Sequence, residues 1–149
     1  MRRAAAVVVA VALAGCGGSD GPDAERPPSA EAVKLARRCD LGRPHGGVPP
    51  STLLPARLLP AGALFFRWDG EGLGARARIV FRDDLLGAQR SVEANAAALG
   101  LPVLFRETEV FDAELDVQSG PEVIRFAFSV VDECPDVTVA AVRKLAGPG

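Results

Sequence analysis

The fold is decided by residues 111–130, whose sequence is FDAELDVQSGPEVIRFAFSV. Apolar and polar side chains alternate on either side of Ser119-Gly120-Pro121, and a period of two residues is typical of a strand with one buried face. The central triplet carries turn residues. The stretch therefore predicts two adjacent strands, the first with a wet acidic face formed by Asp112, Glu114 and Asp116.

The same alternation predicts further strands on both sides of this stretch. Residues 64–69 and 75–82 alternate and are joined by a glycine-rich turn, so we expect a hairpin. In its first strand, parity places Leu64, Phe66 and Trp68 on the buried face and Phe65 on the outer one. Residues 103–109 and 137–142 add two more strands. We expect a bulge near Val110 to join residues 103–109 to the acidic strand.

Two segments carry helical signals. From Leu85 to Leu99 apolar residues recur at spacings of three and four, after a capping aspartate and before Gly100-Leu101-Pro102. Ser29 can cap a shorter helix over residues 30–38. Residues 40–60 are too rich in proline and glycine for one long element. The predicted fold is α+β: an antiparallel sheet of five or six strands with one amphipathic helix packed on it, plus a short N-terminal helix.

The start of the chain has the pattern of an export signal. Arg2 and Arg3 precede ten apolar residues, 4–13, which are too few to span a bilayer. The tetrad Leu13-Ala14-Gly15-Cys16 resembles the lipobox of bacterial prolipoproteins. The resemblance implies a signal peptide over residues 1–15, palmitate-type acyl chains on Cys16, and an extracytoplasmic location on the cell membrane. Residues 16–28 then form a flexible tether, and residues 29–149 form a single α+β domain.

Two cysteines remain once Cys16 is assigned to lipid. An even pair in an exported chain favours a structural disulfide between Cys39 and Cys134. The alternative joins both cysteines with His45, the only histidine, in a copper or zinc site. Three ligands of this kind fall short of the usual metal sets. We therefore expect a disulfide and no bound metal or other cofactor.

Charge and motifs narrow the function. Removing the signal takes away two of 17 basic residues and none of 19 acidic ones, so the net charge becomes −4, which argues against nucleic-acid binding. No serine stands in a hydrolase motif, and no glycine-rich loop opens a helix. The polar faces of the strands carry opposite charges, which we expect to form cross-strand ion pairs. The acidic residues are Glu107, Glu109, Asp112, Glu114 and Asp116, and the basic ones are Arg67, Arg76, Arg78, Arg82 and Arg125.

These observations favour a lipid-anchored protein of the cell envelope that acts as a non-enzymatic binding or accessory module. Its partners would be the membrane, through the lipid on Cys16, and an envelope protein. One alternative is a small hydrolase that uses strand carboxylates, which would need at least two of them in a concave pocket. Another is a carrier of a small apolar ligand in a cavity between helix and sheet, left by Ala75, Ala77 and Ala127.

Overall fold

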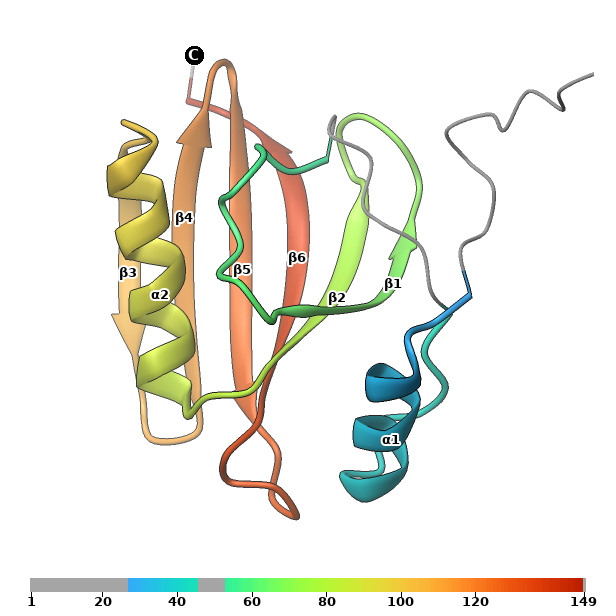
Figure 1. Cartoon of the computed structure of the whole chain (residues 1–149). Coiled ribbons are helices and arrows are strands. Elements are labelled where there is room, and N and C mark those ends of the chain that lie inside the picture. Colours follow the sequence, from blue (N-terminus) through green and yellow to red (C-terminus); the bar gives the residue numbers. More distant parts are fainter. Residues whose placement is uncertain (1–26, 46–52, 149) are drawn as a thin grey trace, which may run out of the picture.

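The computed structural model describes residues 27–45 and 53–148. It contains a six-stranded antiparallel sheet with one main helix on it and a second, short helix, which confirms the α+β fold (Figure 1). The predicted signal peptide, Cys16 and most of the predicted tether lie outside the described residues. The elements in chain order are α1 (Ala30–Arg38), β1 (Leu64–Asp69), β2 (Arg76–Phe81), α2 (Leu85–Ala98), β3 (Val103–Thr108), β4 (Asp112–Ser119), β5 (Glu122–Val130) and β6 (Thr138–Ala146).

The sheet has the strand order β1-β2-β6-β5-β4-β3. Strands β3 to β6 follow one another as hairpins, and β6 closes the sheet by pairing with β2 along residues 76–81. Helix α2 connects β2 to β3, which is the edge strand at the opposite side of the sheet from β1. The topology leaves β1 and β3 as the two edge strands.

The main core lies between α2 and one face of the sheet. Asp84 caps the helix by accepting a hydrogen bond from the Gly87 N–H at 2.7 Å. Phe128 packs against Phe81 and Phe126, with ring centroids 5.7 and 5.8 Å apart. The loop before β1 closes this core with its leucines. The largest fully buried side chains of the main core are Phe81, Phe126, Phe128, Leu58, Ile79, Leu115, Ile124, Val92 and Val117.

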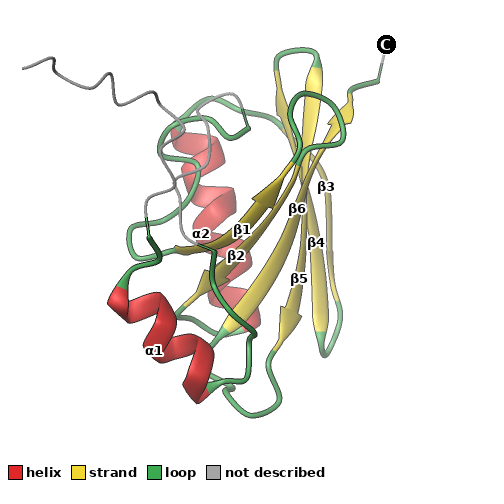
Figure 2. Ribbon diagram, turned by 90° about the vertical axis from the view of Figure 1, so that its right-hand side faces the viewer, coloured by secondary structure: helices red, strands yellow, loops and turns green. Residues whose placement is uncertain are grey.

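A second, smaller core lies on the opposite face, which we call the outer face. Val80 points there because it stands between Ile79 and Phe81, which belong to the main core. Helix α1 covers this part of the outer face at β1, whereas α2 packs on β3, β4 and β5. In Figure 2, α1 lies in front of the sheet strands and α2 lies behind β1 and β2 as seen from this side. The second core consists of Ala32, Leu35, Ala36, Cys39, Leu41, Phe66, Val80, Cys134 and Val137.

A bulge in β1 changes which aromatic side chains share a face. Phe65 lies opposite Ile79 and Arg67 opposite Arg78, so Phe66 is the extra residue. Phe65 and Trp68 therefore pack against the main core, whereas Phe66 is buried in the second one. The expectation that Phe66 and Trp68 share a face, with Phe65 on the outer one, was wrong because simple alternation takes no account of an inserted residue.

The bulge that the sequence predicted near Val110 lies instead at the start of β3. The register of β3 against β4 shifts between Val103 and Phe105. Residues 109–111 instead form the turn between these strands, with the Glu109 N–H donating to the Asp112 carbonyl at 2.8 Å.

Candidate functional site

The predicted cysteine pair forms a disulfide. Cys39, at the end of α1, is bonded to Cys134, in the loop between β5 and β6, across 95 residues of chain. Both residues are buried in the second core. Sulfur atoms joined in this way are not thiolate ligands, so the alternative metal site with His45 is not formed. His45 itself is exposed and donates its backbone N–H to the Phe66 carbonyl at 2.7 Å.

The outer face of the sheet carries most of the charged side chains singled out in the sequence. Strand register places Arg76, Arg143, Arg125 and Asp116 in one row across four neighbouring strands. The next row runs from Arg67 through Arg78, Ala141 and Ala127 to Glu114 and Glu107. Arginines thus gather over β1, β2 and β6, and carboxylates gather over β4 and β3.

The expected pairing of these stripes holds for one pair only. Arg125 donates two hydrogen bonds to the Asp116 carboxylate, at 2.8 and 2.7 Å, and these bonds raise the pKa of the Arg125 guanidinium. Arg67 binds Asp69 of its own strand, and Arg82 binds Glu31 of α1. The general expectation was wrong because β6 and β5 stand between the arginines of β2 and the carboxylates of β4.

Four carboxylates line a hollow of about 290 Å³ at the end of the β3–β4 hairpin. Glu107 lies directly opposite Glu114 in the ladder, and Glu109 and Asp112 complete the group. All except Glu114 are exposed to water. Among the described residues, none of these carboxylates accepts a hydrogen bond from another side chain. A catalytic acid or base needs such partners to fix its orientation.

Exposed apolar side chains lie at the start of β3 and in the turn that follows it. All six residues of β3 are exposed, and after the polar residues 106–109 the turn before β4 exposes two more apolar side chains. The sequence predicted the strand but gave no sign that it is an edge; its one signal is that Val103-Leu104-Phe105 does not alternate. We call these five residues the β3 edge: Val103, Leu104, Phe105, Val110 and Phe111, exposed by 36%, 45%, 42%, 79% and 68%.

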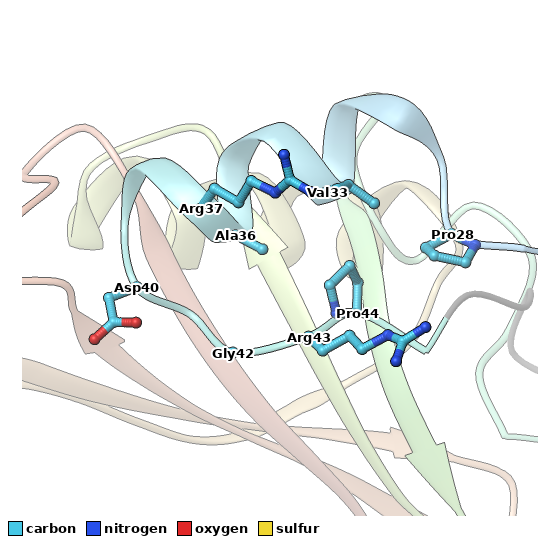
Figure 3. A pocket seen from close by; sticks show the side chains of 8 residues that line it. All are labelled: Pro28, Val33, Ala36, Arg37, Asp40, Gly42, Arg43 and Pro44. Atoms are coloured by element: carbon cyan, nitrogen blue, oxygen red, sulfur yellow. The ribbon is translucent and has the colours of Figure 1, made fainter.

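A second hollow, of about 500 Å³, lies beside α1. Figure 3 shows Val33 and Ala36 of α1 above Pro44 of the loop that follows, with Pro28 at one end and Asp40 at the other. The chain continues from this loop into residues outside the described part, so we assign no ligand to it.

The three alanines invoked for a ligand cavity do not lie together. Ala75 and Ala77 are buried in the main core, whereas Ala127 lies on the outer face between Ala141 and Glu114. Small residues on opposite faces of one sheet do not leave a common void. The carrier alternative therefore loses the structural feature on which it rested.

The described residues 27–45 and 53–148 contain neither a metal-ligating cluster nor a membrane-spanning helix. No group of three or more histidine, cysteine or acidic side chains there could hold a metal ion. No helix in that part of the chain is long and apolar enough to cross a membrane.

Comparison with protein-family models, curated proteins and solved structures found no match for this chain.

Proposed function

We propose that this protein is a lipid-anchored protein of the cell envelope that binds another envelope protein through the β3 edge. The observation that carries the proposal is the β3 edge itself: strand β3 is paired on one side only, and Val103, Leu104 and Phe105 expose consecutive apolar side chains. Natural proteins cover, charge or shorten such edges, because an open edge pairs with other strands. An edge that remains apolar marks an interaction site.

The chemistry of an edge strand defines the partner. The outward backbone groups of β3 can hydrogen-bond to one further strand, and side chains of that strand would alternate between the two faces. On one face they would meet Arg106, which is bound to Glu93 of α2 at 3.2 Å. On the other they would meet Phe105 and Glu107. The partner is therefore an extended segment with an apolar residue opposite Phe105.

The anchor follows from the lipobox resemblance. Two acyl chains on Cys16 suffice for stable attachment, where one chain is marginal. The tether then keeps the domain near the membrane. Intact-mass analysis of the native protein, with and without reductant, tests this part: we expect loss of residues 1–15 and a lipid mass on Cys16. An unlipidated mature chain would overturn the anchor.

Site-specific photo-crosslinking in cells tests the partner. A photoreactive residue in place of Phe111 should yield one defined adduct, and the same residue in place of Leu73 should not. Leu73 is a matched control because it is 60% exposed and lies in the turn between β1 and β2. Equal labelling at both positions, or no adduct at Phe111, would contradict the proposal.

A second candidate, a small hydrolase, is favoured by the carboxylate-lined hollow. In that case Glu114→Gln should abolish turnover of an ester or glycoside substrate, while Glu71→Gln, in the exposed β1–β2 turn, should leave it unchanged. Absence of turnover across both substrate classes leaves the binding function as the better account.

A further inference from the structure

The arginines of the outer face lie directly opposite one another. Arg143 of β6 stands between Arg76 of β2 and Arg125 of β5, and Arg78 stands opposite Arg67 of β1. Like charges directly opposite one another destabilise a sheet. This arrangement concentrates positive charge on a chain whose net charge is negative.

Only two of the five arginines are neutralised within the described residues. Arg125 is held by Asp116, and the Arg67 Nε lies 2.8 Å from the Asp69 carboxylate. Arg76, Arg78 and Arg143 are exposed and form no ion pair with any described residue, although Asp69, which binds Arg67, lies opposite Arg76 in the ladder. We call these three residues the arginine patch. Alanines at 127 and 141 beside them leave the guanidinium groups open to a large flat partner.

The chain enters the domain on the same face. Helix α1, which begins at Ala30, packs on Val80 of β2, two residues along from Arg78. In Figure 1 the start of α1 lies beside β1, at the opposite side of the sheet from β3. A tether of 13 residues reaches at most about 45 Å, so an anchored domain stays close to the lipid surface.

We propose that the arginine patch rests on the anionic lipid headgroups of the membrane in which the chain is anchored. The inference rests on the proposed function, since the anchor supplies the membrane. Guanidinium groups bind phosphate oxygens through paired hydrogen bonds, and each basic residue near an anionic surface adds to the attraction. The attraction falls off within about 10 Å at ordinary ionic strength, so only side chains close to the surface contribute.

The arginine patch also determines how the domain is oriented on the membrane. Glu107 and Glu114 lie at the other end of the same face, and an anionic surface repels them. The domain therefore tilts, with β1, β2 and β6 toward the membrane and β4 and β3 away from it. Six strands at about 4.8 Å spacing separate β1 from β3 by roughly 24 Å. This displays the β3 edge outward, where an envelope protein can reach it.

Vesicle co-sedimentation tests the patch separately from the anchor. The chain from residue 16 with Cys16→Ser, disulfide formed, is mixed at low salt with vesicles of phosphatidylcholine alone or with 30% phosphatidylglycerol. We expect binding to the anionic vesicles only. Arg78→Ala/Arg143→Ala should lower the partition coefficient roughly thirtyfold, as expected for two lost surface charges.

A matched variant removes the same charge elsewhere. Arg57→Asn/Arg90→Ala removes two exposed arginines on the α2 side, and asparagine tolerates the positive φ of 69° at position 57. This variant should bind as the parent chain does. Arg78→Lys/Arg143→Lys should also retain binding, because a charged surface does not require the guanidinium fork.

Three outcomes would overturn the proposal. Equal loss in both alanine variants would show a non-specific charge effect. Loss in the lysine variant, with saturable binding of inorganic phosphate, would show a discrete phosphate site in place of a lipid surface. A dimer in sedimentation velocity that the alanine variant dissolves would show that the patch meets a second copy. Failure of lipidation in the intact-mass experiment would remove the anchor and leave the vesicle result standing.

Discussion

The two edges of the sheet are built differently. At β1, helix α1 and the disulfide cover the strand, Phe66 is 2% exposed, and its carbonyl accepts the His45 N–H. At β3, every residue is exposed, although the strand is just as long. Figure 1 shows α1 beside β1, with α2 lying over β3 on one side only.

The difference between β1 and β3 suggests separate roles for the two edges, one in stability and one in the proposed binding. The β1 edge is protected in the ways by which natural sheets avoid pairing: it is covered, bulged and partly hydrogen-bonded. Strand β3 also has a bulge and two charged residues, Arg106 and Glu107, yet Val103, Leu104 and Phe105 remain exposed to water. Strand β1 is packed at Phe66 although Arg67 and Asp69 stay exposed, whereas β3 has no buried residue. This contrast supports the proposal that the β1 edge serves folding and the β3 edge serves a partner.

The sharpest test makes the same substitution at both edges. Phe66→Ala removes a buried side chain from the second core and should lower the free energy of unfolding by about 3 to 5 kcal/mol. Phe105→Ala, at a side chain 42% exposed, should lower it by less than about 1 kcal/mol. Urea unfolding of both variants measures the two losses. Similar losses would show that the β3 edge is as much a part of the core as the β1 edge.

The disulfide gives the next largest effect. Cys39→Ala/Cys134→Ala opens a loop of 95 residues, and we expect it to lower the free energy of unfolding by about 2 to 4 kcal/mol. Hydrogen exchange should rise first in α1, because the bond holds the end of that helix to the β5–β6 loop. If exchange rises uniformly over the sheet, the bond stabilises the whole domain and not the β1 end.

Sequence periodicity predicted the elements well, because each strand buries one face. The alternation in residues 111–130 gave β4 and β5 close to their observed bounds, and the three-and-four spacing from Leu85 gave α2. The disulfide followed from counting cysteines. These features depend on local composition, which a single sequence displays in full.

Features set by neighbours in space could not be predicted in the same way. The prediction of cross-strand ion pairs was wrong because the sequence does not reveal that β6 lies between β2 and β5. Arg143 was missing from the predicted basic residues because the last strand was predicted over residues 137–142, whereas β6 continues to Ala146. The exposed edge was missed because Val103-Leu104-Phe105 is equally compatible with a buried strand.

A smaller loss is expected where α2 holds β3. The buried Gln89 amide donates to the carbonyls of Glu107 and Glu114 at 2.9 and 3.0 Å, and its oxygen accepts from the Thr108 hydroxyl at 2.8 Å. Gln89→Leu leaves those groups without their partner and should cost about 1 to 3 kcal/mol in urea unfolding. Asn95→Leu, which loses one bond of 3.3 Å to Leu58, is the control and should cost less. Equal losses of unfolding free energy would mean that the hydrogen bonds of Gln89 contribute nothing particular to holding β3.

The smallest effect on stability is expected where the effect on binding is largest. Leu104→Lys places a charge at the β3 bulge, on a side chain that is 45% exposed, and should change the free energy of unfolding by less than about 0.5 kcal/mol. A lysine on an edge strand opposes pairing with a further strand, so the adduct formed by a photoreactive residue at position 111 should disappear. Leu73→Lys makes the same change in the β1–β2 turn and should leave the adduct intact. A stable Leu104→Lys protein that still forms the adduct would show that the partner contacts the turn at Val110 and Phe111 without pairing along β3, because a charge at the bulge blocks a strand but leaves that turn accessible.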